Sequence, residues 1–314
     1  MTTYEVVGKP VTRQEGPDKV SGNFQYSADV TLPGMIWGKV LRSPFPHAKL
    51  VKIDASKALA MPGVHAVITG QDTLGMRIGR SVRDVPLLAE GEVRFVGEKV
   101  AAVAADDPDL AEEALLMIDV EYEPLPAVFD PVEAMEPGAP HVHAGSPIFE
   151  STSGPVQPQG NILNHSTWSS GDVEQGFSES DQIFEHTFST TWVHQGYMEP
   201  YSCVVDIDDA GRVQVWANNK VPYTLRRQLA DALGLSEDQI LVNPCGIGGD
   251  FGGKSPAMNV PLAYFLSRSS GRPVKMIMSY IEELVAVNPR HPSVITIKTG
   301  VMNDGTFMAR ESRV

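Results

Sequence analysis

The feature that most constrains this chain is a glycine-rich stretch, GIGGDFGGKS, at positions 246–255. It follows a predicted strand, Ile240 to Asn243, and precedes a predicted helix, Ala257 to Ser269. Glycines let the backbone approach a ligand closely, and exposed N–H groups near a helix start can hold anionic oxygens. The stretch therefore predicts a mixed helix-and-sheet fold that binds an oxygen-rich, negatively charged group.

Two other interpretations of this stretch need to be weighed. Residues 248–255 fit the phosphate-loop formula, in which G is followed by four residues and then GKS. Against it, Pro256 removes a backbone donor just after the motif, and no apolar strand ending in a magnesium-binding Asp follows. The glycines could also serve only to pack a helix on a strand. Phe251 at the tip disfavours both alternatives, because an aromatic there suits a pocket that excludes water from a reactive centre.

The residues before position 126 combine short β-rich runs with turns. Predicted strands are Ile36 to Leu41, Val64 to Thr69, Val93 to Val96 and Lys99 to Ala105. Asp107 caps a predicted helix ending near Met117, and the strand Ile118 to Tyr122 follows. This order predicts a crossover helix packed on one sheet.

A Pro-, Gly-, Ser- and His-rich segment, Glu123 to Gly160, indicates a surface connector. Beyond it the pattern predicts a helix with a leucine face and five further strands. The helix is Pro222 to Leu233, stopped by Gly234; the strands are Gln182 to Trp192, Ser202 to Ile207, Arg212 to Ala217, Val274 to Met278 and Ser293 to Gly300. We therefore expect domains at residues 1–126 and 161–314, joined by a connector at 127–160.

Charge and composition exclude several classes of function. The formal charge of −14 repels phosphate backbones, which disfavours a nucleic-acid partner. No apolar run approaches the roughly 20 residues of a membrane span, and the N-terminus has no apolar signal region, so we expect a cytoplasmic protein. Cys203 and Cys245 are far apart and form no disulfide framework, zinc spacing or cluster-binding motif. Any iron–sulfur centre would lie in another chain.

Several motifs, in order, resemble one family. They are the loop GGDFGGK, the upstream HQGYMEP at His194 to Pro200, and the N-terminal pieces GKPVTRQEGPDKVSGNFQYSADV and RFVGEKVAAVAADDPDLAEEALLMIDVEYEPLP. The chain is similar to the molybdenum hydroxylases related to xanthine dehydrogenase and aldehyde oxidase. The resemblance implies an α+β architecture: an α/β hammerhead domain followed by the first part of a molybdopterin-binding domain. It also implies a molybdenum–molybdopterin cofactor, with a dinucleotide form as one option, that hydroxylates N-heteroaromatic or aldehyde substrates with oxygen from water.

The resemblance carries site roles onto particular residues. It places Phe251 and Gly252 against the oxygen ligands of the metal, with Gly248, Gly249 and Gly253 shaping the loop. It implies no direct protein ligand to the metal. Many members have a Gln that bonds the apical oxygen of molybdenum at the position of Lys220, and this Lys is either a replacement donor or an exposed residue at a strand end.

Other positions relate to the substrate pocket. Xanthine oxidisers carry a purine-binding Glu where this chain has Ser255, so xanthine is a disfavoured substrate. Glu199 is expected to be buried and hydrogen-bonded near the pocket. The general-base Glu of the family is expected in a C-terminal half outside these 314 residues, so no catalytic residue is assigned here. Glu98 is interpreted as structural.

The absent half of the molybdopterin domain leaves two explanations, a subunit split between genes or a truncated product. We favour a split subunit whose partners are a C-terminal molybdopterin-domain chain, an iron–sulfur subunit and an FAD subunit. A phosphate-loop nucleotide hydrolase and a non-catalytic scaffold of the same fold are the alternatives. Structural roles explain three other features: His141 and His143 are interpreted as a solvated pair in the connector, Arg290 and His291 as a turn, and Cys245 as a buried thiol.

Overall fold

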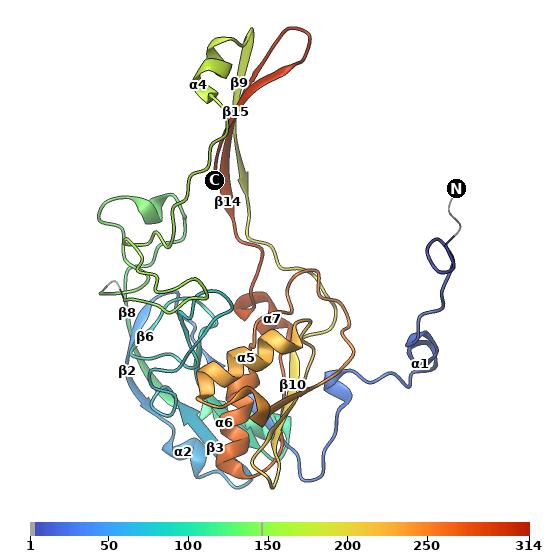
Figure 1. Cartoon of the computed structure of the whole chain (residues 1–314). Coiled ribbons are helices and arrows are strands. Elements are labelled where there is room, and N and C mark those ends of the chain that lie inside the picture. Colours follow the sequence, from blue (N-terminus) through green and yellow to red (C-terminus); the bar gives the residue numbers. More distant parts are fainter. Residues whose placement is uncertain (1–3, 146) are drawn as a thin grey trace.

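A seven-stranded mixed sheet forms the centre of the body (Figure 1). The computed structural model describes residues 4–145 and 147–314; the first three residues of the predicted hammerhead segment and one residue of the predicted connector lie outside it. The strand order is β12-β11-β10-β13-β1-β7-β3. The strands are β1 (Ile36–Arg42), β3 (Val64–Thr69), β7 (Lys99–Ala105), β10 (Ser202–Ile207), β11 (Val213–Ala217), β12 (Ile240–Asn243) and β13 (Val274–Ile277).

Strands from both ends of the chain share this sheet. The first strand, β1, pairs in parallel with β13, so that Ile36 lies opposite Val274, and it pairs antiparallel with β7 on its other side. The sheet is therefore continuous across the segments predicted as the hammerhead and molybdopterin-binding domains.

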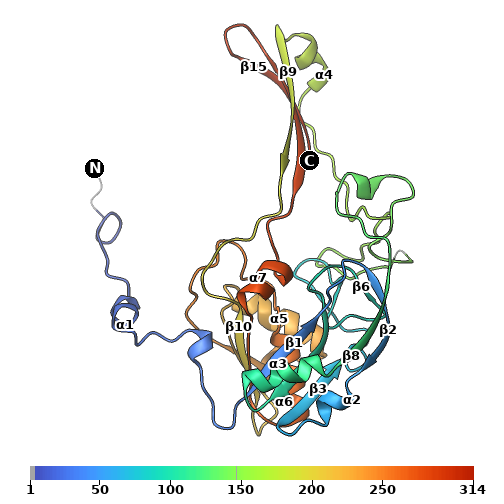
Figure 2. The same cartoon turned by 180° about the vertical axis from the view of Figure 1, so that it is seen from behind.

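Strand β7, which lies between β1 and the edge strand β3, is buried on both faces because helices cover the sheet from two sides. Ala102 and Ala104 belong to the main core, whereas Ala101 and Val103 pack in a second cluster. Helices α5 (Pro222–Leu233) and α6 (Val260–Ser270) contribute to the main core (Figure 1). Helix α3 (Pro108–Leu116) lies against β1 and β7 on the opposite face (Figure 2). A strand covered on both faces is expected to be a continuous apolar run, as KVAAVAA is.

The prediction that α3 joins two strands of one sheet is wrong. The strand after it, β8 (Asp119–Pro124), pairs with β2 (Ala48–Asp54) in a separate three-stranded sheet with β6 (Glu92–Val93). Val120 and Tyr122 are half-buried between exposed neighbours, and both pack against a small buried cluster of Ala48, Ala89, Val93 and Val100. A strand that buries only one of its faces fits this outer three-stranded sheet better than the seven-stranded sheet, which helices cover on both faces.

A long three-stranded ribbon projects from the body (Figures 1 and 2). It consists of β9 (Gln182–Thr190), β14 (Ser293–Val301) and β15 (Phe307–Arg313), with α4 (Val173–Ser178) packed against β15. Every side chain of β9 is exposed. Among the described residues, these three strands therefore form a sheet that buries no hydrophobic core.

The remaining elements are short. They are α1 (Gly16–Ser21), α2 (Ser56–Leu59), α7 (Tyr280–Ala286), the pair β4 (Arg77–Ile78) and β5 (Val85–Pro86), and the 3₁₀ turns η1 (Ser27–Asp29), η2 (Glu133–Met135) and η3 (Glu237–Gln239). Among the described residues, no helix is both long and apolar enough to cross a membrane.

Candidate functional site

The glycine-rich loop runs from the end of β12 to the start of α6 and carries Phe251 outward. Phe251 has a φ of 44°, and its side chain is 76% exposed. A left-handed backbone is costly for an aromatic residue. The flanking Gly249 and Gly252 have φ values of 103° and 97°, which only glycine adopts readily. The sequence therefore holds an apolar ring at the surface in a strained conformation.

Asp250 fixes this conformation from within the loop. One carboxylate oxygen accepts the N–H of Gly252 at 3.0 Å, and the other accepts the N–H of Lys254 at 2.6 Å. Desolvation raises the pKa of Asp250, but the hydrogen bonds from Lys220 and from these two amides outweigh it and hold the pKa below its usual value. The carboxylate is therefore ionised at neutral pH.

Lys220 binds this same carboxylate. Its Nζ lies 2.8 Å from Oδ2 of Asp250, and the two side chains are 35% and 23% exposed. The residue lies between β11 and α5, and its N–H donates to the carbonyl oxygen of Lys254 at 3.0 Å. Lys220 is thus neither free in solvent nor isolated at a strand end: it is tied to the loop at two points.

Glu199 and Lys254 form an ion pair beneath the loop. Oε2 of Glu199 accepts the N–H of Gly248 at 2.7 Å and is also bonded to Nζ of Lys254. The Lys254 side chain has no exposed surface, and its Nζ lies 4.6 Å from the centroid of the Tyr197 ring. In a phosphate loop the lysine must reach its ligand, but the ammonium of Lys254 is already paired with Glu199 in the interior. The helix also does not follow the loop directly, because α6 begins only at Val260. The phosphate-loop interpretation is not supported.

A buried carboxylate that the sequence did not single out supports this platform. Glu283 on α7 has no exposed surface; it accepts the hydroxyl of Tyr197 at 2.8 Å and is also bonded to the N–H of Tyr201. The hydroxyl of Tyr201 in turn donates to the carbonyl oxygen of Gly253 at 2.5 Å. The pKa values of both tyrosines are raised, chiefly by desolvation, so both hydroxyls remain protonated donors. Glu283 is thus connected to the loop through Tyr201.

The four loop glycines predicted to lie at the site, Gly248, Gly249, Gly252 and Gly253, have different roles. A Cβ on Gly248 would lie 2.9 Å from Cβ of Glu199, and one on Gly253 would lie 2.7 Å from Cε1 of Tyr197, so both are needed for packing. A Cβ on Gly252 would meet nothing within 4 Å. Within residues 4–145 and 147–314, the amides of Gly249 and Phe251 donate to no acceptor. The loop therefore combines two backbone N–H groups that have no partner among the described residues with open space at Gly252.

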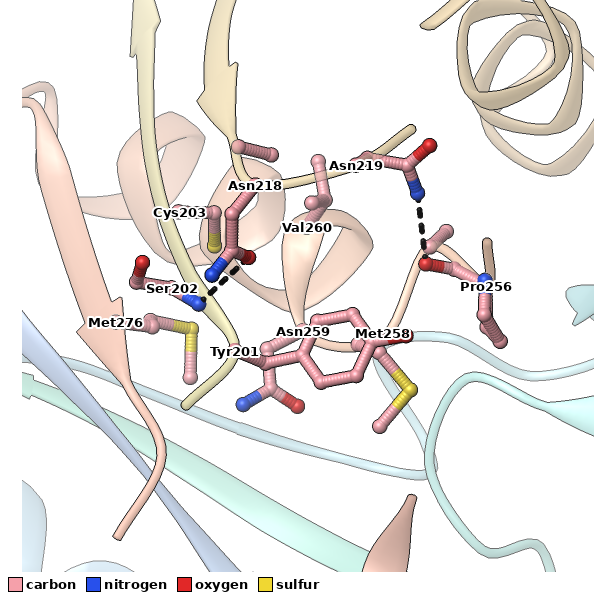
Figure 3. A pocket seen from close by; sticks show the side chains of 12 residues that line it. Tyr201, Ser202, Cys203, Asn218, Asn219, Pro256, Met258, Asn259, Val260 and Met276 are labelled. Atoms are coloured by element: carbon pink, nitrogen blue, oxygen red, sulfur yellow. Dashed lines mark hydrogen bonds between the residues drawn. The ribbon is translucent and has the colours of Figure 1, made fainter. Parts of the chain in front are cut away.

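Ser255, which the sequence analysis relates to the substrate pocket, is a buried residue at the exit of the loop. It is 6% exposed; its N–H donates to the carbonyl oxygen of Gly253 at 2.9 Å, and its own carbonyl accepts Nδ2 of Asn219 at 3.1 Å. Next to it, Tyr201, Asn218, Met258 and Asn259 surround a small cavity between the loop and the ends of β10 and β11 (Figure 3). In the same view Nδ2 of Asn219 donates to the carbonyl oxygen of Pro256 at 3.0 Å. These bonds fix the exit of the loop.

The other weighed residues lie elsewhere or are inert. Glu98 is 4% exposed and is bonded to the N–H of Arg94, which suits a structural role. Burial raises the pKa of Cys245 to about 11, so its thiol is not a thiolate at neutral pH. His143 packs on Phe149, and the described residues contain no group of three or more potential metal ligands. The predicted Arg290 turn pairs with Val193 at the base of the ribbon.

Comparison with known proteins identifies the two parts of this architecture. Residues 21–126 match the a/b hammerhead domain of aldehyde oxidase and xanthine dehydrogenase, and residues 156–314 match the molybdopterin cofactor-binding domain. The chain is 38% identical to a probable xanthine dehydrogenase subunit of Bacillus subtilis, over 98% of this chain and 40% of that protein. It is 33% identical to the nicotinate dehydrogenase large molybdopterin subunit of Eubacterium barkeri, over 98% of this chain and 69% of that subunit.

Solved structures agree. Quinoline 2-oxidoreductase from Pseudomonas putida 86 superposes with a TM-score of 0.86 at 31% identity, covering 98% of this chain and 39% of the other. The fold is thus a hammerhead domain followed by a molybdopterin-binding domain, which confirms the predicted α+β class. The chain belongs to the molybdenum hydroxylase family of xanthine dehydrogenase and aldehyde oxidase, as a molybdopterin-binding member. It spans about 40% of the length of the Bacillus subtilis relative.

Proposed function

We propose that this chain is the molybdenum–pterin subunit, or part of one, of an oxidoreductase that hydroxylates an N-heteroaromatic or aldehyde substrate with oxygen from water. The observation that carries the proposal is the exposed Phe251 in a left-handed loop flanked by free amides. An apolar ring held at the surface at a conformational cost is expected to face a group outside this chain. The relatives named as nicotinate dehydrogenase and quinoline 2-oxidoreductase support an N-heteroaromatic substrate.

The loop fits an oxygen-rich cofactor. The N–H groups of Gly249 and Phe251 would donate to its oxygens, and the open space at Gly252 would admit it closely. The ring of Phe251 would exclude water from that face. When bound, the molybdenum–pterin group supplies two-electron oxidation of carbon, and we propose a dinucleotide form as one option to be tested.

The residues around the loop would orient it rather than react. Asp250 holds the amide of Gly252, and Lys220 holds Asp250, so Lys220 acts on the site through this carboxylate. Glu199 holds Gly248 from below, and Gly253 is held through Tyr201. We assign no general base to this chain.

We further propose the division into a hammerhead domain at 1–126, a connector at 127–160 and a molybdopterin-binding part at 161–314. The proposed partners are a C-terminal molybdopterin-domain chain, an iron–sulfur subunit and an FAD subunit, in a cytoplasmic complex. The name of the Eubacterium barkeri relative, a large molybdopterin subunit, supports a molybdenum site divided among chains.

The test is isolation of the intact assembly from its own cells under mild conditions. Molybdenum, iron, pterin and flavin are measured, and product formed in ¹⁸O-labelled water is analysed by mass spectrometry. We expect molybdenum and pterin in proportion to this chain, and label in the product. An assembly with neither molybdenum nor pterin would overturn the proposal. Tight binding of magnesium ATP by that same metal-free sample would favour the nucleotide hydrolase.

A further inference from the structure

His194 begins the turn that leads into Tyr197, and its side chain is only 7% exposed. Its Nδ1 accepts the N–H of Gly196 at 3.0 Å, and Gly196 has a φ of 72°. A side chain that accepts an N–H two residues later in the chain stabilises a tight turn, as Asn and Asp side chains commonly do. The imidazole of His194 therefore shapes the backbone just before Tyr197.

The hydrogen bond from Gly196 fixes the protonation state of this ring. A ring nitrogen that accepts an N–H carries no proton, so the single proton of the neutral imidazole is on Nε2. Nε2 is buried, has no hydrogen-bond partner among the described residues, and lies 3.7 Å from Oε2 of Glu283. The structure therefore contains the neutral form of His194, between one backbone donor and one buried carboxylate.

Protonation of the ring would change both of these contacts. A proton on Nδ1 would point at the N–H of Gly196, so that hydrogen bond would be lost. The cationic ring would also attract Glu283, the one carboxylate of the described chain within ion-pair distance of it. Oε2 of Glu283 already accepts the hydroxyl of Tyr197 at 2.8 Å, so the ring would compete with Tyr197 for the same oxygen.

The other titratable groups around the ring are tyrosines and a lysine. The ring centroids of Tyr197 and Tyr280 lie 4.9 and 6.2 Å from that of His194. Nζ of Lys254 lies 4.6 Å from the centroid of the Tyr197 ring and is paired with Glu199. None of these groups supplies a second anion, so Glu283 is the group toward which a cationic ring would move.

Tyr197 connects this turn to the glycine-rich loop. A Cβ on Gly249 would lie 3.1 Å from Cβ of Tyr197, and a Cβ on Gly253 would lie 2.7 Å from Cε1 of its ring. The side chain of Tyr197 therefore packs against the loop on both sides of Phe251. A shift of Tyr197 would remove this support from the loop.

We propose that His194 is a positioning residue: its neutral ring holds the glycine-rich loop in the conformation described above, and protonation of the ring makes the loop mobile. Imidazole is the side chain whose ordinary charge change lies between about pH 5 and 8, so the loop is controlled in mildly acidic solution. An effect on cofactor retention rests on the proposed function, whereas the effect on the loop itself does not.

The experiment uses the full chain, purified with its copurifying subunits, at about pH 5.5 and about pH 8, on either side of the usual imidazole pKa. Amide hydrogen exchange of residues 246–255 is measured by mass spectrometry and corrected for the intrinsic effect of pH on exchange. Molybdenum content is measured after dialysis of the same samples. We expect protection of the wild-type loop to be about fivefold lower in acid, the factor expected for loss of one hydrogen bond, with molybdenum lost in parallel.

Two variants separate protonation from packing. His194→Asn keeps an acceptor for the N–H of Gly196 but cannot take up a proton, so its loop should be equally protected at both pH values. His194→Ala has no acceptor and should show low protection at both. His165→Asn, at an exposed histidine before α4, is the matched control and should behave like wild type.

Three results would overturn the proposal: equal protection of the wild-type loop at both pH values, a pH dependence that persists in His194→Asn, or wild-type behaviour of His194→Ala. An assembly without molybdenum at either pH would contradict the proposed function, and the exchange pattern would still decide the role of His194. The failure of one is therefore distinguishable from the failure of the other.

Discussion

The hydroxyl of Tyr197 donates a 2.8 Å hydrogen bond to Glu283, a carboxylate with no exposed surface that is also bonded to the N–H of Tyr201. The hydroxyl of Tyr201 donates to the carbonyl oxygen of Gly253, so Glu283 is connected through Tyr201 to the glycine-rich loop. A helix after the last strand of the central sheet thus supports a loop that lies about 30 residues earlier in the chain.

Replacing this carboxylate with an amide should destabilise the chain strongly. In Glu283→Gln an NH₂ group replaces one carboxylate oxygen, so either the Tyr197 hydroxyl or the Tyr201 N–H loses its acceptor. We therefore expect a loss of about 2–4 kcal/mol in the free energy of unfolding. Chemical denaturation measures it. Glu112→Gln, at an exposed pair with Lys39, should cost under about 1 kcal/mol. Equal losses in the two variants would contradict the role given to Glu283.

The glycine at position 248 is required by packing alone. In Gly248→Ala the new methyl group would lie 2.9 Å from Cβ of Glu199, and we expect a cost of about 1–3 kcal/mol. Gly16→Ala is the control, because its Cβ would make an ordinary 3.6 Å contact in helix α1. Thermal unfolding of the two variants decides the point, and an unchanged melting temperature in Gly248→Ala would refute it.

Phe251 should matter to the cofactor and hardly at all to stability. Phe251→Gly removes a ring that is 76% exposed and relieves a φ of 44°, so the free energy of unfolding should stay within about 1 kcal/mol of wild type. Molybdenum content of the purified assembly should fall severalfold. Trp168→Gly, which removes an 89% exposed ring outside the loop, is the control and should keep its molybdenum. Full molybdenum retention in Phe251→Gly would contradict the proposed site.

The ion pair of Lys220 and Asp250 should contribute modestly to the free energy of unfolding, and only while the Asp250 carboxylate is ionised. We expect Lys220→Met to lower stability by about 0.5–1 kcal/mol at pH 7, because both groups are partly exposed. The folded pKa of Asp250 is depressed, so its contribution is present above the unfolded pKa and is lost as the pH falls through the folded value. The difference between wild type and Lys220→Met should therefore disappear in acid, as denaturation at pH 2 to 7 would reveal.

Lys99 should make stability rise in alkaline solution. Burial lowers its folded pKa to about 8, below the unfolded value of 10.5, so between these two pH values the unfolded chain binds more protons and stability increases with pH. Lys99→Met should be more stable than wild type at pH 7, by up to about 3 kcal/mol, with the gap closing toward pH 10. Parallel pH profiles of wild type and Lys99→Met would refute this.

Much of the secondary structure was predictable because local chemistry decides it. Helix α5 runs from Pro222 to Leu233 as predicted, since proline favours its first turn and Gly234 ends it in a left-handed conformation. Strands β3, β7, β10 and β12 also have the predicted bounds. Helix α6 begins at Val260 rather than Ala257, because Pro261 occupies its first turn.

The site was predictable only in its loop. The glycines and Phe251 stand out in the sequence, but Glu283 does not, since its importance comes from a fold that brings it to Tyr197 across 86 positions. The contact of Lys220 with Asp250 depends in the same way on tertiary packing, which no local pattern contains. The sheet assignment of β8 failed for the same reason.

The position of β13 has a consequence for synthesis of the chain. It is the last of the seven strands along the sequence, yet it lies in the middle of the sheet, between β10 and β1. Until the ribosome has released residue 277, β1 and β10 each have a bare edge in the nascent protein. Such edges recruit other chains, so we expect this polypeptide to need a chaperone that shields them, and to form aggregates when translation outpaces that protection.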